Sequence, residues 1–289
     1  MVDYLKEYSS ALYNYSIVKQ MIVKNHVSHY PVLDELLGFQ YYLNKKFTEY
    51  FNSHSSEFDK FTPALSSYLL FFYNTQSLQS ALNDIEYDRI HQAAVNLRTV
   101  YEAIPKMYYI SLFPEENEFV MVHEHIAVMP LEKVLQELKE EECIKYLNGK
   151  ELKFESKSAL RKFKGKYTPN TIRKKLYSQK RHELIQNLYG VFSNSTHPNI
   201  LRNRTSTRYE PKDTELFFNF LKSLSYFNIQ AYLEGNIEFL IKMGIHQEVV
   251  TFLNAKAKQL KSFYEDVYFF PDNEDLDRKL KSSVETRTN

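Results

Sequence analysis

The feature that most constrains the fold is a stripe of apolar residues between positions 90 and 108. Its members lie four or three positions apart in alternation, which places all of them on one face of an α-helix; they are Ile90, Ala94, Leu97, Tyr101, Ile104 and Tyr108. Only 6 of the 289 residues are glycine. Sandwiches, barrels and dinucleotide-binding α/β units use glycine in their turns and phosphate loops. We therefore expect an all-α, multi-helix bundle.

Helical periodicity continues along most of the chain. It predicts helices over residues 3–24, 31–51, 62–82, 85–112, 169–192, 214–243 and 246–268, with Gly244 separating the last two. Pro105 falls inside the fourth helix, so we expect a kink or the start of a new helix there. Residues 115–130 interrupt the pattern and predict a short strand or an apolar linker, and residues 130–147 predict a charged helix.

These elements suggest a division of the chain into four parts. We expect an N-terminal helical part over residues 1–113 and a C-terminal helical part over 169–270 that completes the bundle. Between them, residues 114–168 form a linker or insertion with a short strand or helix and an irregular basic segment. Residues 271–289 are polar and charged, which is typical of a flexible tail.

Targeting signals are not apparent. The first residues lack the basic and then apolar order of a signal peptide, and the most apolar window, 65–73, is far shorter than the roughly 20 residues of a membrane span. Cys143 is the single cysteine, which leaves no intramolecular disulfide and no cysteine-rich zinc site. We expect a cytoplasmic protein that does not associate with membranes.

Positive charge is concentrated in residues 153–181, although the net charge of the whole chain is only +1. This segment holds eleven Lys and Arg against one acidic residue, Glu155. Such a patch attracts phosphate backbones with little sequence selectivity. The candidate nucleic-acid contacts are Arg161, Lys162, Lys164, Lys166, Arg173, Lys174 and Lys175, extended by Arg202 and Arg204 in the following loop. A solvated face, a protein-docking face or neutralisation by acidic residues of the same protein are the alternatives.

Two other places carry candidate chemistry. Arg98 and Glu102 lie four apart at the border of the apolar stripe, so they form either a simple surface ion pair or the wall of a polar pocket in which Arg98 holds an anion. His197 follows a predicted helix in a polar run that includes Asn194. It is either a general base for a hydroxyl or a loop histidine bonded to a nearby carbonyl.

Metal and cofactor chemistry find little support. In a strand, His123 and His125 would share one face and form a metal pair, but the sequence names no third ligand. The remaining histidines, His54 and His91 among them, form no ligand pattern. The chain has no glycine-rich phosphate loop, no GxSxG, no HExxH and no paired CxxC. We expect no metal and no cofactor.

Two short fragments resemble a known family. Residues 96–103 (NLRTVYEA) resemble the LR-x-x-x-E helix of HEPN-like helical proteins, in particular an uncharacterised bacterial branch, and residues 188–197 (LYGVFSNSTH) resemble the second element of that branch. HEPN proteins are helical bundles, often dimeric, and many act in toxin–antitoxin modules and phage defence as metal-independent ribonucleases. The resemblance implies that Arg98, Glu102, Asn194 and His197 meet in one polar cleft as the catalytic residues.

The ribonuclease motif of those proteins, Arg followed after four to six residues by His, is absent here, and its nearest imitation is Lys175 with His182. We therefore expect a HEPN-like prokaryotic defence or toxin-type protein that binds RNA or a protein partner and forms a homo-oligomer. Whether the protein also cleaves RNA as a metal-independent endoribonuclease is left open by the sequence. The alternatives are a non-catalytic interaction or scaffold protein, which 23 Tyr and 21 Phe would suit, and a metal-dependent hydrolase built on His123 and His125.

Overall fold

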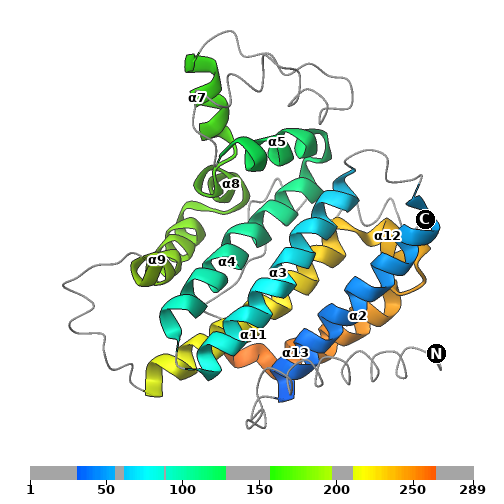
Figure 1. Cartoon of the computed structure of the whole chain (residues 1–289), viewed down its shortest axis with the longest axis vertical. Coiled ribbons are helices and arrows are strands. Elements are labelled where there is room, and N and C mark those ends of the chain that lie inside the picture. The colour runs from blue at the N-terminus through cyan, green and yellow to red at the C-terminus, as the bar shows by residue number, and fades with distance from the viewer. Residues whose placement is uncertain (1–30, 56–61, 88, 128–156, 197–210, 265–289) are drawn as a thin grey trace.

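A computed structural model describes residues 31–55, 62–87, 89–127, 157–196 and 211–264 (Figure 1). These residues form ten α-helices and one 3₁₀ helix and contain no strand, which confirms the predicted all-α, multi-helix bundle. No helix among them is long and apolar enough to cross a bilayer. The elements are α2 (Pro31–Ser53), α3 (Pro63–Glu86), α4 (Ile90–Leu112), η2 (Pro114–Glu116), α5 (Asn117–Ala127), α7 (Lys157–Lys166), α8 (Pro169–Leu176), α9 (Gln179–Thr196), α11 (Pro211–Gly235), α12 (Ile237–Lys242) and α13 (His246–Tyr264).

Helices α3, α4 and α11 pack against one another and form the centre of the bundle (Figure 1). The predicted stripe on α4 is completely buried there, from Ile90 to Tyr108. Helices α8 and α9 pack on the other side of α4, whereas α2 and α13 pack against α11. Because α4 has neighbours on both sides, its apolar surface is wider than the single stripe, and 14 of its residues are buried.

A polar network crosses the middle of this core. The side-chain amide of Asn228 on α11 donates to Gln40 Oε1 on α2 at 2.6 Å, and its oxygen accepts from Asn74 Nδ2 on α3 at 2.8 Å. Thr75 Oγ1 donates to the same Gln40 oxygen at 3.3 Å. All four residues are buried. Because each bond joins two different helices, the network determines how α2, α3 and α11 align.

The first and last described helices are joined by side chains. Phe39 of α2 stacks on Phe252 of α13 with ring centroids 3.8 Å apart. Tyr42 donates to Glu248 Oε2 at 2.8 Å, and Lys256 forms an ion pair with Glu35. The contacts combine apolar burial with charge-assisted bonds, so α13 holds α2 on the bundle.

Several predicted boundaries differ from the structure. The prediction of a strand or linker after residue 115 is wrong for residues 117–127, which form α5. The buried residues Asn117, Val120 and His123 recur every three positions, as a helix packed on the bundle requires. Pro105 starts no new helix, since α4 continues through it to Leu112.

The C-terminal half contains more breaks than its periodicity indicates. The helix predicted over 169–192 is two helices, because Tyr177 is extended (φ −122°, ψ 146°) and ends α8. The helix predicted over 214–243 is divided into α11 and α12 at Asn236. The expected separation at Gly244 is confirmed, and its φ of +73° explains why a glycine stands there. The elements predicted over 3–24 and 130–147 and the tail over 271–289 lie outside the described residues.

Candidate functional site

A charged cluster lies where α4, α8 and α9 meet, and it contains the predicted pair Arg98 and Glu102. Arg98 Nε donates to Glu102 Oε1 at 3.0 Å, and the two side chains are 30% and 24% exposed. The Arg98 guanidinium also lies 4.9 Å from the ring centroid of Tyr189 on α9. The predicted ion pair therefore exists, and it is half-buried against another helix rather than isolated on the surface.

Arg173 of α8 approaches the same tyrosine from inside the protein. Its guanidinium lies 5.0 Å from the Tyr189 centroid, and its Nη2 donates to Gln186 Oε1 at 3.1 Å. The residue is only 2% exposed, and within the described part of the chain its Nε and Nη1 have no hydrogen-bond partner. Arg173 was predicted as a surface contact for phosphate. It lies inside because the face of α8 that carries Ile172, Arg173 and Leu176 is buried.

Burial and charge set the protonation of the neighbouring groups. Burial, together with the positive charges of Arg173 and Lys174, lowers the pKa of His182, so this imidazole is neutral at pH 7. Its Nδ1 is buried and has no partner among the described residues. Burial and a hydrogen bond to Glu102 raise the pKa of Tyr189, which stays protonated. Among the residues that the structure describes, Glu102 is the carboxylate whose charge acts on both guanidinium groups.

Local sequence features explain how the cluster forms. Thr168 caps α8 by accepting from the backbone N–H of Thr171 at 3.2 Å, and Pro169 occupies the first turn. The break at Tyr177 then lets α9 return across α4. There, Tyr101 donates to the carbonyl of Ile185 at 2.7 Å and fixes the two helices together. Sequence analysis did not identify His182, Gln186 or Tyr189 as parts of this site, although Tyr189 belongs to the fragment that carries the family resemblance.

The other predicted catalytic residues remain untested. His197 lies outside the described residues, as do Arg202 and Arg204. Asn194 is in the last turn of α9, and only its backbone is described. From Tyr189, where Arg98 makes its contact, α9 continues for about 10 Å to its end at Thr196, at 1.5 Å per residue. The meeting of Arg98 with His197 stays a prediction.

The basic segment is divided by the structure into paired and unpaired cations. Lys166 binds Glu116 Oε1 at 3.2 Å, and Lys175 donates to the Tyr109 hydroxyl at 2.6 Å and lies 3.7 Å from Glu116 Oε2. Burial raises the pKa of Glu116, but its bonds to Tyr109 and Lys166 outweigh this and leave the pKa lowered. Glu116 is therefore shared by two lysines and neutralises one of their two positive charges.

The outer cations of the segment face solvent. Arg161, Lys162 and Lys174 are exposed and make no hydrogen bond or ion pair with any residue that the structure describes. Lys164 is half-buried, and its carbonyl bonds to His123 Nε2 at 2.8 Å. Lys106 and Glu124 form a further ion pair at 2.8 Å beneath this region. The surface of α7 and α8 thus keeps a positive charge that these inner acids do not neutralise.

The metal hypothesis loses its geometric basis. His123 and His125 lie on helix α5 and not on a strand, so the strand on which the pairing depended is absent there. His123 is buried and places Nδ1 3.6 Å from Glu124 Oε1. The described residues contain no group of three or more His, Cys, Asp or Glu able to hold a metal ion.

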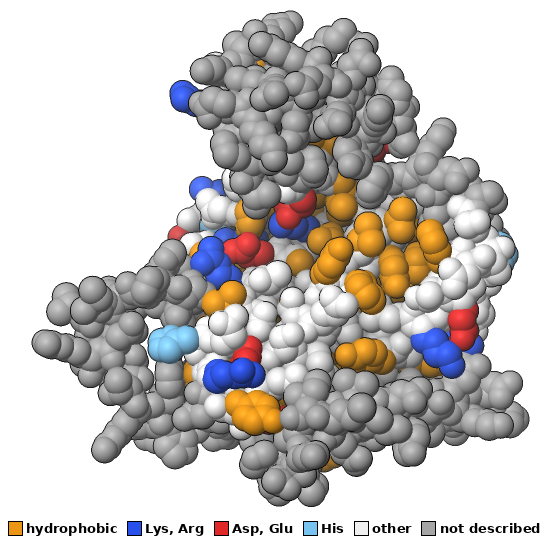
Figure 2. Space-filling model, viewed as in Figure 1, with side chains coloured by type: hydrophobic (Ala, Val, Ile, Leu, Met, Phe, Trp, Pro, Cys, Tyr) orange, Lys and Arg blue, Asp and Glu red, His pale blue; other side chains and the backbone are white. Residues whose placement is uncertain are grey.

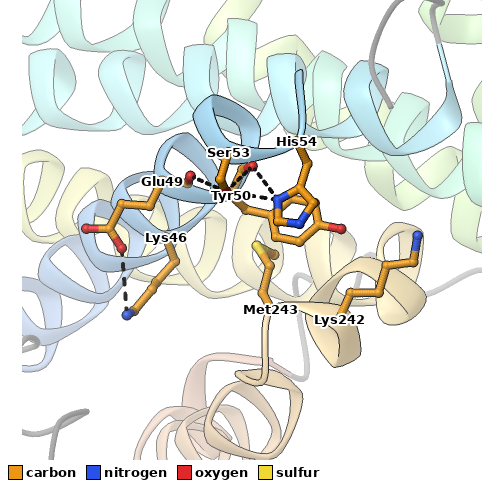
Figure 3. A pocket seen from close by; sticks show the side chains of 7 residues that line it. All are labelled: Lys46, Glu49, Tyr50, Ser53, His54, Lys242 and Met243. Atoms are coloured by element: carbon orange, nitrogen blue, oxygen red, sulfur yellow. Dashed lines mark hydrogen bonds and ion pairs between the residues drawn. The ribbon is translucent and has the colours of Figure 1, made fainter. Parts of the chain in front are cut away.

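A separate hollow of about 500 Å³ opens between the ends of α2 and α12 (Figure 3). It is lined by Lys46, Glu49, Tyr50, Ser53, His54, Lys242 and Met243. The His54 ring stacks on Tyr50, with centroids 4.1 Å apart, and its Nδ1 lies 3.1 Å from the Tyr50 carbonyl. A carbonyl only accepts, so Nδ1 carries the proton and helps to satisfy the end of α2. This explains His54 as a helix-capping residue.

No family model, curated protein or solved structure matches the chain. The chemistry of the described residues is therefore the basis for inferring what the protein does. Two features stand out: the outward cations of α7 and α8, and the inward cluster of Arg98, Arg173, His182 and Tyr189.

Proposed function

We propose that the protein binds RNA through its phosphate backbone on the outer surface of α7 and α8. The observation that supports this is the set of exposed cations Arg161, Lys162 and Lys174, which have no anionic partner in the described part of the chain. Phosphate groups are the natural counterions of such a surface, and Arg98 lies half-buried on neighbouring α4. With the resemblance to HEPN-like proteins, this favours a role in prokaryotic defence or as a toxin.

Backbone binding of this kind has a recognisable signature. Each phosphate neutralised on a single strand contributes about −0.7 to the slope of log K against log salt concentration. Three outer cations therefore correspond to a slope of about −2, with little preference for sequence. RNA cleavage is a separate question, tested by comparing wild type, His197→Ala and Arg98→Ala on labelled RNA without metal. Equal cleavage by all three, or none by wild type, excludes these two residues from catalysis.

The test of binding is fluorescence anisotropy with a labelled single-stranded RNA over a range of salt concentrations. We expect Lys162→Glu and Lys174→Glu each to weaken binding about 3- to 10-fold at 100 mM salt and to flatten the salt slope. Lys258→Glu on α13 is the matched control, because Lys258 is also exposed but lies on another side of the bundle. Equal losses in all three variants contradict the proposal, since they would reflect net charge alone.

A second candidate function is self-association through α3. Leu69, Phe72 and Tyr73 lie at helical spacing on one side of α3, where Leu69 and Phe72 are half-buried and Tyr73 is 60% exposed. Figure 2 shows hydrophobic side chains gathered over this part of the bundle. Sedimentation velocity tests this: Tyr73→Glu should dissociate a dimer that Asn254→Glu, at an exposed position of α13, leaves intact. A monomeric wild type at 100 μM removes this candidate.

A further inference from the structure

The charged cluster between α4, α8 and α9 is electrically incomplete. Arg98 forms an ion pair with Glu102 at 3.0 Å. Arg173 donates to the neutral Gln186 and lies against the Tyr189 ring, and the charge of Glu102 acts on it without a hydrogen bond. An arginine keeps its charge at neutral pH, and a buried charge without a counterion is costly. Among the described residues, Glu102 thus serves two guanidinium groups, and its only hydrogen bond to either of them is with Arg98.

The hydrogen-bond donors of Arg173 point to the chemistry of the missing group. Nε carries one N–H and Nη1 carries two, and all three lack an acceptor among the described residues. Buried polar groups in folded proteins are nearly always paired. The missing partner must accept several hydrogen bonds and carry negative charge. Both properties belong to an oxyanion, and arginine is the side chain that best matches phosphate.

The two guanidinium groups share one neighbour, the ring of Tyr189. Both lie about 5 Å from the centroid of this ring, and the Arg98 side chain is 30% exposed whereas Arg173 is 2% exposed. Tyr189 thus holds the two side chains in place through cation–π contacts. Arg98 stands at the solvent side, where a ligand would arrive, and Arg173 forms the inner end.

We propose that this cluster is a binding site for a single phosphate group, held by Arg173 on the inside and by Arg98 at the rim. The site is distinct from the outer surface of α7 and α8, and it does not require that surface to bind RNA. The phosphate is either the terminal phosphate of an RNA strand or free phosphate. A terminal phosphomonoester matches the site better than a backbone diester because it carries more negative charge and more free acceptor oxygens.

The first experiment uses inorganic phosphate and thermal unfolding at constant ionic strength, with sodium chloride as the reference salt. We expect Tm to rise by about 2–4 °C when phosphate reaches about five times its Kd, and the rise to saturate. Arg98→Gln and Arg173→Met should remove this response, whereas Lys174→Gln, an exposed neighbour on α8, should keep it. A wild type that responds equally to both salts overturns the proposal, as does an unchanged response in Arg98→Gln.

Arg98→Gln keeps the test decisive if Arg173→Met fails to fold, because Arg98 is only half-buried. A second readout is the NMR signal of the His182 imidazole. Bound phosphate offsets the charge of Arg173, which now lowers the pKa of His182, so we expect that pKa to rise on addition of phosphate. An unchanged His182 titration in saturating phosphate contradicts the assignment.

The second arm separates the two sources of phosphate. Binding of a 5′-phosphorylated RNA is compared with that of the same RNA ending in a 5′-hydroxyl. A roughly 10-fold preference for the phosphorylated strand, lost in Arg98→Gln but kept in Lys162→Glu, assigns the site to an RNA end. Equal binding of both strands, with the response to inorganic phosphate intact, assigns it to free phosphate. If RNA does not bind at all, the proposed function fails, and the unfolding test still decides the phosphate site.

Discussion

Asn228→Ala should be among the most damaging small substitutions in this protein, because Asn228 joins three helices of the core. The change removes two hydrogen bonds: the one that Asn228 donates to Gln40 at 2.6 Å and the one that it accepts from Asn74 at 2.8 Å. Each such bond contributes about 1 kcal/mol, and leaving Asn74 Nδ2 without an oxygen acceptor costs about 1–3 kcal/mol more. The higher helix propensity of alanine adds back about 0.5 kcal/mol to the free energy of unfolding. The expected net loss is about 3 kcal/mol.

Urea and thermal unfolding followed by circular dichroism measure this loss. For a chain of this size, about 3 kcal/mol corresponds to a decrease in Tm of about 6–12 °C. Asn219→Ala is the matched control: Asn219 is on the same helix, is half-buried and makes one weak contact, from Lys222 Nζ at 3.4 Å. We expect that variant to stay within about 0.5 kcal/mol of wild type.

A double-mutant cycle identifies the origin of the effect. If the network acts as a unit, Asn74→Ala costs less in the Asn228→Ala background than alone, with a coupling of about 0.5–3 kcal/mol. A loss below about 1 kcal/mol for Asn228→Ala, or no coupling with Asn74, would refute the view that these amides hold the helices in register.

Three further predictions concern stability. Tyr101→Phe removes the 2.7 Å bond to the Ile185 carbonyl and should cost about 1 kcal/mol, with faster amide hydrogen exchange in α9 than in α3; equal exchange in both helices contradicts the role given to Tyr101. Gly244→Ala places a side chain at φ +73° and should lower the free energy of unfolding by about 1 kcal/mol, whereas Gly165→Ala, in a helix with open space around it, should not. Burial raises the pKa of Glu124, but hydrogen bonds and charges from His123 and Lys106 outweigh this and bring it to about 2, below its ordinary value of 4.5. The folded-state pKa is depressed, so the stabilisation is present above pH 4.5 and is lost as the pH falls toward 2. Urea unfolding at pH 6 and pH 3 should therefore show a smaller acid-induced loss for Glu124→Gln than for wild type, and equal losses would contradict the pairing with Lys106.

Helix positions were predicted most accurately where one physical pattern, apolar spacing or an early proline, was clear in the sequence. The stripe on α4 and the starts of α2, α3 and α8 follow from apolar spacing and from prolines at early helical positions. Residues 117–127 were mistaken for a strand or linker because a continuous apolar run is compatible with both periods. The break at Tyr177 carries neither glycine nor proline, so no local signal marks it.

The site shows a different limit. Arg98 and Glu102 were found because both partners lie on one helix at a spacing that brings them together. Their contact with Tyr189 depends on how α9 packs, which local patterns do not determine. Arg173 was misplaced for a related reason: charge predicts exposure, and only the packed structure puts this side chain inside. Composition does not reveal that Arg173 is buried, yet this buried guanidinium is the main observation behind the proposed phosphate site.

The pairing of α2 with α13 has a consequence for biosynthesis. Phe39 leaves the ribosome more than 200 residues before Phe252, the ring on which it stacks. A growing chain therefore exposes the apolar face of α2 to solvent until nearly all of the bundle has been translated. Chaperone binding during that interval should concentrate on α2. Messages cut short before α13 should yield polypeptides that are cleared by proteolysis instead of accumulating.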